Sequence, residues 1–195
     1  MSPLVYIVRH GQTDWNVAER LQGQADIDIN AKGRGEATGN GRRLAELIAD
    51  PQDFDFVASP MIRTRHTMEL VRQAMGLPAS GYSTDPRLME MNFGDWQGYT
   101  IAEVEERYPG STRGRVLDKW DFRPPGNAAE SYQMLLERVR PFFQALERRT
   151  VCVTHGGVIR ALFRLVEKVP KAKAGSLDTP QDRILRWQDG HLEWL

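Results

Sequence analysis

Leu4-Val5-Tyr6-Ile7-Val8-Arg9-His10-Gly11, near the start of the chain, joins an apolar run to an arginine, a histidine and a glycine. Consecutive apolar and β-branched residues predict a strand that is covered on both faces, as in a parallel sheet. Arginine presents a planar fork that matches phosphate oxygens, and glycine at position 11 lets the backbone approach a ligand. A neutral imidazole can attack phosphorus and form a covalent intermediate. Taken alone, the tripeptide is equally compatible with an ordinary turn.

The same pattern recurs twice along the chain. Thr150-Val151-Cys152-Val153-Thr154 predicts a strand that ends at His155-Gly156-Gly157, with a helix to about residue 167. Phe54-Asp55-Phe56-Val57-Ala58 predicts a strand that ends at Ser59-Pro60, interpreted as the N-cap and first residue of a helix to about residue 75. Ligands bind beyond the carboxyl ends of parallel strands, and helix N-termini such as Gly156 bind phosphate. We therefore expect His10, Ser59-Pro60 and His155 to share one edge of the sheet.

The remaining elements complete a fold prediction. Helical patterns cover residues 31–49, 100–108 and 128–148, a weak strand lies near 81–83, and residues 184–195 read as a hairpin around Asp189-Gly190. Strands that alternate with helices predict a three-layer α/β/α sandwich with a mostly parallel central sheet. The length of 195 residues fits one domain over residues 1–195. Residues 109–127 are rich in Gly, Pro and Arg, so we expect a lid or insertion at about 99–127 that is not a core element.

Composition excludes several classes of protein. Lys plus Arg equals Asp plus Glu, at 26 each, so the basic excess of a nucleic-acid binder is missing and an anion site must be a local cluster. The single cysteine, Cys152, excludes an intrachain disulfide and is expected to be a buried structural thiol. No apolar stretch approaches the ~18 residues of a membrane span, and the N-terminus lacks the basic region of a signal peptide. We expect a cytoplasmic protein with no membrane partner; nothing in the sequence predicts an oligomeric state.

Further candidates come from chemistry. Arg63 falls in the first turn of the helix after Ser59-Pro60, so its side chain can reach back toward an anion. A leaving alkoxide needs a proton, and a carboxyl group near phosphate has a raised pKa through like-charge repulsion. Glu90 or Asp95 could supply that proton, and sequence chemistry does not choose between them. A metal site is not expected, since no ligand pattern fits the spacing of the nearby acids Asp14, Asp26 and Asp28.

Five motifs in a fixed order resemble the histidine phosphatase superfamily, in the branch similar to cofactor-dependent phosphoglycerate mutase. They extend over residues 4 to about 165 and are Arg9-His10-Gly11-Gln12-Thr13-Asp14-Trp15-Asn16, Leu21-Gln22-Gly23, Ser59-Pro60-x-x-Arg63-Thr64-x-x-Thr67, Arg87-Leu88-x-Glu90 with Gly94, and Thr154-His155-Gly156.

The resemblance implies a role for each matching residue. His10 would be the phosphohistidine nucleophile and Glu90 the proton donor, which decides against Asp95. Arg9, Arg63 and His155 would hold the transferring phosphoryl group. The phosphate- or substrate-binding positions would be Gly11, Asn16, Gln22, Gly23 and Gly156. The resemblance implies neither a metal nor an organic cofactor, because positive donors around phosphate supply the electrostatic stabilisation.

Departures from the mutases favour a phosphatase. Phe93 stands where mutases carry a tyrosine, about Ile101 where they carry a lysine, and Gly157 where they have an asparagine. Each difference removes a polar contact to a second acidic group of the substrate. We therefore expect a phosphomonoester phosphatase that acts on a small phosphorylated metabolite.

Two alternatives stay open: a cofactor-dependent phosphoglycerate mutase, and a non-catalytic phosphate- or phosphoprotein-binding module. The intact set of candidate catalytic residues argues against the second alternative. Basic side chains of the lid could replace the lost contacts, although a solvated basic loop is the simpler interpretation of Arg113, Arg115, Lys119 and Arg123.

Overall fold

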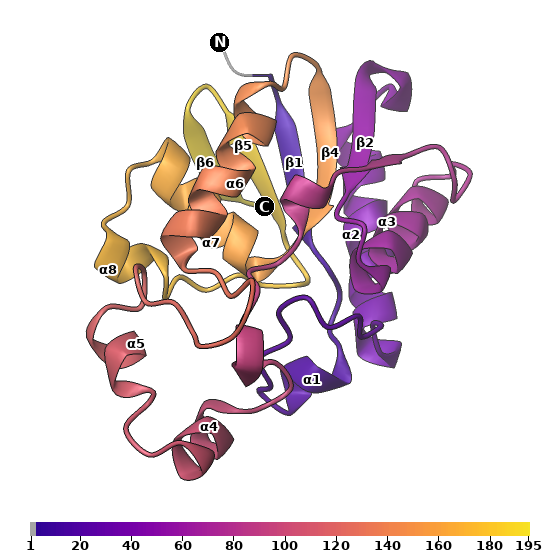
Figure 1. The fold of residues 1–195 in the computed structure, drawn as a ribbon. Coiled ribbons are helices and arrows are strands. Elements are labelled where there is room, and N and C mark those ends of the chain that lie inside the picture. Colours follow the sequence, from indigo (N-terminus) through magenta and orange to yellow (C-terminus); the bar gives the residue numbers. More distant parts are fainter. Residues whose placement is uncertain (1–2) are drawn as a thin grey trace.

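The central sheet has six strands in the order β3-β2-β4-β1-β5-β6, and helices cover both of its faces (Figure 1). This computed structural model describes residues 3–195. The strands are β1 (Val5–Arg9), β2 (Phe54–Ala58), β3 (Ser83–Thr84), β4 (Arg149–Thr154), β5 (Ile184–Gln188) and β6 (His191–Trp194). The first four are parallel, and the β5–β6 hairpin adds two antiparallel strands beside β1. The predicted mostly parallel α/β/α sandwich is confirmed.

The helices are α1 (Asp14–Val17), α2 (Ala31–Leu47), α3 (Ile62–Ala74), α4 (Ile101–Arg107), α5 (Arg113–Leu117), α6 (Tyr132–Gln144), α7 (Gly156–Val166) and α8 (Lys171–Ala174). Alternate residues of β1 serve opposite cores, as the period of a strand requires. Val5 and Ile7 belong to the core on the side of α6 and α7. Tyr6 and Val8 belong to the core on the side of α2 and α3.

Two predicted helix starts are wrong for identifiable reasons. Helix α3 begins at Ile62 after Met61, because the Ser59 side chain hydrogen-bonds His155 instead of capping the helix. Helix α6 begins at Tyr132 and not near residue 128, because Ala128 has a left-handed φ of 58° and the Ser131 side chain caps the helix.

The segment at residues 99–127 extends below the carboxyl ends of the strands, carrying α4 and α5 (Figure 1). Part of it enters the core, contrary to the expectation that it contributes none: Trp120 is buried and stacks on Tyr132 of α6, with 5.4 Å between the ring centroids. This contact anchors the segment, here called the lid segment, to the α/β sandwich. In the described part of the chain, no helix is long and apolar enough to cross a membrane.

Candidate active site

Three strand ends meet where the sequence predicted. The backbone N–H of His10 donates to Thr154 O at 2.9 Å, and that of Ser59 donates to Val153 O at 3.0 Å. These bonds join the ends of β1 and β2 to the end of β4 between them. The rings of His10 and His155 consequently lie 5.2 Å apart between centroids. The predicted shared edge is confirmed.

His10 is held with one defined nitrogen free. Its Nδ1 lies 2.8 Å from Gly11 O, which can only accept, so Nδ1 carries the proton and Nε2 keeps its lone pair. Burial lowers the pKa of His10 well below 6.5, and the charges of Arg63 and Arg9 lower it further. The imidazole is therefore neutral near pH 7, in the form required of a nucleophile.

His155 lies behind His10 and is completely buried. The Nε–H of Arg63 donates to its Nδ1 at 3.3 Å, so the proton of the neutral ring is on Nε2, which donates to Ser59 Oγ at 2.8 Å. The pKa of His155 is well below 6.5, because burial lowers it most and the neighbouring Arg63, His10 and Arg9 lower it further. Its ring is not part of the cavity lining, so in this arrangement it orients Arg63.

Arg63 links helix α3 to the loop after α1. Its Nη1 and Nη2 donate to Ala25 O at 2.8 Å and Gly23 O at 2.7 Å. Gly23 has a left-handed φ of 51°, and a Cβ there would displace the Gln97 side chain, so both features favour glycine at this position. Burial lowers the pKa of Arg63 to about 10, which still leaves it charged at pH 7. Arg63 thus places a fixed positive charge beside His10.

Arg9 is anchored from the C-terminal part of the chain. Its Nη1 donates to Thr179 O at 2.7 Å, while its buried Nε has no partner among the described residues. Gly156 packs closely against this contact between Arg9 and Thr179. A Cβ at Gly156 would come within 2.9 Å of Thr179 Oγ1 and 3.4 Å of Arg9 Nε. Sequence reasoning did not identify Thr179, which carries no motif signal.

Glu90 is fixed by two backbone amides. Its Oε1 accepts from Met91 N at 2.9 Å, and its Oε2 accepts from Gly157 N at 3.1 Å, in the first turn of α7. Each oxygen retains a second lone pair that can carry a proton. A Cβ at position 157 would lie only 2.1 Å from Glu90 Oε1. Gly157, noted as a departure from the mutases, therefore makes room for the candidate acid. Asp95 packs beside Gly126 and does not line the cavity.

Arg138 of α6 holds the loop that carries Glu90. Its guanidinium donates to Arg87 O at 2.8 Å, Met89 O at 3.0 Å and Glu90 O at 3.2 Å. Glu130 pairs with the same guanidinium at 2.7 Å. No sequence pattern singles out Arg138, since an arginine in an amphipathic helix normally faces solvent.

The other predicted positions divide into lining and supporting residues. Asn16, Gln22 and Gly23 line the cavity. Gly11 is not among the lining residues; a Cβ there would lie 2.2 Å from Gly33 O, so glycine permits the close approach of α2. The side chain of Gln181, also missed, donates to His10 O at 3.0 Å and to Asn16 Oδ1 at 3.1 Å.

The cavity in front of His10 measures about 180 Å³ and is strongly cationic. Its basic residues are Arg9, Arg20, Arg63, Arg115, Lys119 and Arg160, against a single carboxylate, Glu90. Arg115 and Lys119 were expected to be solvated, and that expectation is wrong because both turn into the cavity. Arg160 could have been found from sequence, since it lies one turn into α7, the helix that follows His155. Such a site is suited to an anion with several negative charges.

Comparison with known proteins agrees with this geometry. Residues 5–194 match the sequence profile of the histidine phosphatase superfamily (branch 1). The chain is 32% identical to a glucosyl-3-phosphoglycerate phosphatase of Mycobacterium tuberculosis over 85% of this chain and 76% of that protein. It is also 32% identical to phosphoglycerate mutase-like protein 4 of Arabidopsis thaliana, over 97% and 86% of the respective chains.

A solved structure shows the same relationship in three dimensions. A mycobacterial glucosyl-3-phosphoglycerate phosphatase in complex with VO3 superimposes with a TM-score of 0.78 at 28% identity, covering 100% of this chain and 97% of that one. Sequence profile, relatives and fold therefore lead to one assignment. This chain belongs to branch 1 of the histidine phosphatase superfamily and is a phosphotransfer enzyme of that family.

Proposed function

We propose that the chain is a phosphomonoester phosphatase in which His10 carries the phosphoryl group. The observation that supports this most is the free Nε2 of a neutral, buried His10 in a cavity that also contains Arg9, Arg63 and Glu90. Nε2 attacks phosphorus, the N–P bond forms, and the ester P–O bond breaks. Glu90 gives its proton to the leaving oxygen, so that the alcohol departs neutral.

The second half-reaction returns the enzyme to its starting state. Glu90, now a carboxylate, takes a proton from water as the water oxygen attacks phosphorus, and the N–P bond breaks. Arg9 and Arg63 stabilise the charge on the phosphoryl oxygens in both steps. Inorganic phosphate leaves, and the proton on Glu90 is available for the next turnover.

Two observations favour hydrolysis over mutase activity. Phe93 lines the cavity without a hydroxyl group, and Gly157 has no room for a polar side chain while Glu90 holds its position. Similar proteins include glucosyl-3-phosphoglycerate phosphatases, so glucosyl-3-phosphoglycerate is the substrate to test first.

The test is release of inorganic phosphate from 4-nitrophenyl phosphate, with His10→Ala as the variant. The matched control is His66→Ala, because His66 pairs with Asp28 and does not line the cavity. We expect His10→Ala to lose activity by on the order of 10⁴-fold or more and His66→Ala to retain it. Absence of both phosphate release and an acid-labile phosphoenzyme in the unaltered protein would refute the proposal.

A second assay separates hydrolase from mutase. The protein is incubated with 3-phosphoglycerate and a catalytic amount of 2,3-bisphosphoglycerate, and both 2-phosphoglycerate and inorganic phosphate are measured. We expect inorganic phosphate to be the main product. Rapid formation of 2-phosphoglycerate would show that the protein is a mutase and not a phosphatase. Activity without added metal or cofactor, and a cytoplasmic location, stay predictions from the sequence.

A further inference from the structure

The segment that carries Glu90 depends on side chains of other segments for its backbone hydrogen bonds. Arg138 of α6 donates to three of the four carbonyl groups from Arg87 to Glu90. The fourth, Leu88 O, accepts from Thr154 Oγ1 of β4 at 2.9 Å. Carbonyl groups away from water need partners, and an irregular segment has no strand or helix ladder to supply them. The position of the candidate acid is therefore set from outside its own segment.

Arg138 has all of its donors in use. An arginine carries five N–H groups in a rigid fork. In Arg138, three of them donate to carbonyl groups of the Glu90 segment, and the other two donate to Glu130 Oε1 at 2.7 Å and Oε2 at 2.8 Å. The two side chains of this ion pair are mostly buried, with exposed fractions of 23% and 13%. A guanidinium paired in this bidentate way keeps one orientation, so it is a fixed point for the segment.

A second side chain reaches the same carbonyl group of Glu90. Gln24, in the loop after α1, donates from Nε2 to Glu90 O at 3.1 Å, and Arg138 donates to it at 3.2 Å. The Gln24 amide oxygen accepts from Asn92 Nδ2 at 3.3 Å, and the backbone N–H of Asn92 donates to Glu130 Oε2 at 3.1 Å. These contacts close a circuit, here called the hydrogen-bond ring, that runs through Arg138, Glu130, Asn92 and Gln24 and returns to Glu90 O.

The hydrogen-bond ring also connects the acid to the arginine beside His10. Gln24 follows Gly23, whose carbonyl oxygen accepts from Arg63 Nη2 at 2.7 Å. One peptide unit therefore joins a contact to the phosphate-binding arginine and a contact to the segment of Glu90. The positive charge and the proton donor are thus aligned on the same pair of residues.

The ring holds Glu90 from behind the cavity. Gln24 and Arg138 are not among the residues that line the cavity in front of His10, so they are placed to act on the reaction through Glu90. A general acid must come within about 2.6–3.2 Å of the oxygen that it protonates. A misplacement of about 1 Å can slow a reaction by about 10²-fold. Small movements of Glu90 O are therefore sufficient to change the rate of proton transfer.

We propose that Arg138 and Gln24 are positioning residues for the general acid, and that the hydrogen-bond ring sets the distance over which Glu90 transfers its proton. The inference rests on the proposed function, because it concerns the proton that Glu90 gives to the leaving oxygen. That proton moves from the carboxyl group to the ester oxygen as the P–O bond breaks and the bond from His10 to phosphorus forms. An alkoxide needs the proton in order to leave, whereas 4-nitrophenolate leaves without it.

The ratio of two rates tests this role. kcat is measured for glycerol 3-phosphate, an alkyl ester, and is divided by kcat for 4-nitrophenyl phosphate. We expect Arg138→Met to lower this ratio by about 10–100-fold, and Gln24→Met, which leaves the ion pair of Arg138 with Glu130 intact, to lower it by about 3–10-fold. Unfolded molecules are inactive toward both esters, so a loss of stability alone leaves the ratio unchanged.

Matched controls carry the same substitutions outside the hydrogen-bond ring. Arg140→Met removes an exposed arginine of α6, and Gln144→Met removes an exposed glutamine of the same helix. Neither substitution should change the ratio. A fall in Arg140→Met equal to that in Arg138→Met would assign the effect to α6 as a whole and overturn the inference.

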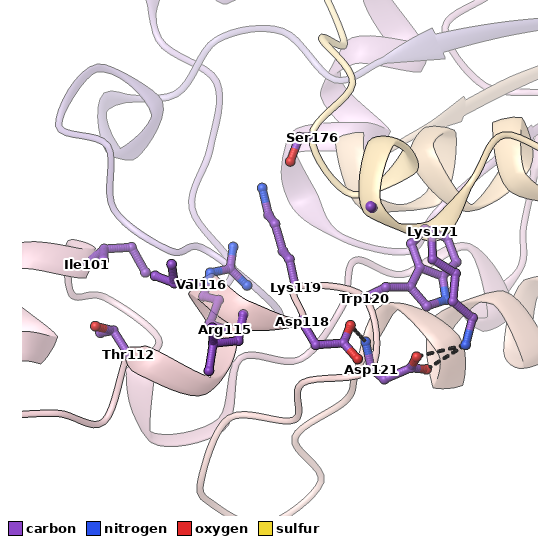
Figure 2. Close-up of a pocket in the computed structure, with 12 residues that line it drawn as sticks. Ile101, Thr112, Arg115, Val116, Asp118, Lys119, Trp120, Asp121, Lys171 and Ser176 are labelled. Carbon is purple, nitrogen blue, oxygen red and sulfur yellow. Dashed lines mark hydrogen bonds and ion pairs between the residues drawn. The ribbon is translucent and has the colours of Figure 1, made fainter.

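A third control separates the hydrogen-bond ring from the lid segment, which is anchored on the same helix. Trp120 stacks on Tyr132 of α6, and the Asp121–Lys171 ion pair joins the next residue of the lid segment to α8 at 2.7 Å (Figure 2). Lys171→Met breaks this ion pair without removing a member of the ring, so it should leave the ratio unchanged. A fall as large as that in Gln24→Met would assign the effect to the lid segment and overturn the inference.

Failure of the inference can be told from failure of the proposed function. A ratio that falls in Glu90→Gln but stays unchanged in both Arg138→Met and Gln24→Met would overturn the inference and leave the proposed function standing. Hydrolysis of 4-nitrophenyl phosphate that survives His10→Ala would refute the proposed function, and the inference with it.

Discussion

The two ends of the cavity are built differently. At the inner end, the side chains of His10, Arg63 and Glu90 are each held by hydrogen bonds to the backbone at strand ends, helix starts and adjoining loops. At the outer end, Arg115 and Lys119 come from the lid segment and are held by packing against Phe93 and beside Gly175. Hydrogen bonds to the backbone hold the reacting groups with the precision that bond formation requires. A long side chain on a short helix can change its position and so accommodate different alcohols. We therefore propose that the inner end sets the reaction and the outer end the choice of substrate.

After His10→Ala, Glu90→Gln should show the largest effect on the inner end. Glutamine keeps the size of the side chain and cannot protonate an alkoxide, so hydrolysis of an alkyl phosphate should slow by about 10²–10⁴-fold. 4-Nitrophenyl phosphate has a good leaving group and should slow far less. The measurement is kcat for both esters. Equal slowing of the two would contradict the general-acid role.

Arg63→Met should follow in size. It removes one charged donor beside the phosphoryl group and also frees Gly23 O and Ala25 O, so kcat should fall by about 10²–10³-fold. The control is Arg65→Met on the same helix, because Arg65 does not line the cavity. An equal fall in kcat for both variants would contradict the distinction between an organised inner end and its surroundings.

The pH profile should separate the two ends. The lowered pKa of His10 keeps the imidazole neutral as pH falls through 6.5, so the acid limb due to His10 should lie below that value. On the alkaline side, Lys119 loses its proton above about pH 8, because burial, Arg115 and Arg160 disfavour its charged form. For a substrate with a second anion, kcat/KM should fall above that pH, and Lys119→Met should lack this limb. An alkaline limb unchanged in Lys119→Met would exclude the lysine as its source.

Glycine substitutions in α2 should give the smallest effect, on stability. A Cβ at Gly33 would lie 2.3 Å from Gln12 O, whereas a Cβ at Gly35 meets nothing within 4 Å. Gly33→Ala should cost about 1–3 kcal/mol through overpacking. Gly35→Ala should be neutral or stabilise by up to about 1 kcal/mol through helix propensity. Urea unfolding of both variants measures the difference, and equal free energies would show that α2 can move away from the site without cost.

The sequence by itself determined where the inner end lies. Apolar runs with a strand period end at His10 and at His155, and parallel strands bring such ends together, so both histidines and Arg63 could be placed before the fold was known. The motif order supplied Glu90 against Asp95, a choice that residue chemistry alone left open. These predictions succeed because the period of a strand and the start of a helix are local properties of the chain.

Tertiary structure alone decided the rest. Contacts between distant segments place several side chains of the site. Arg63 donates to His155, Gly11 packs against α2, and Arg115 and Lys119 line the cavity. The bond from Arg9 to Thr179 joins residues 170 positions apart. No local pattern encodes such a contact, because it arises only when the core fixes both segments. Local periodicity thus determined the position of the nucleophile, and the packing of Trp120 of the lid segment onto Tyr132 of α6 determined which charges surround it.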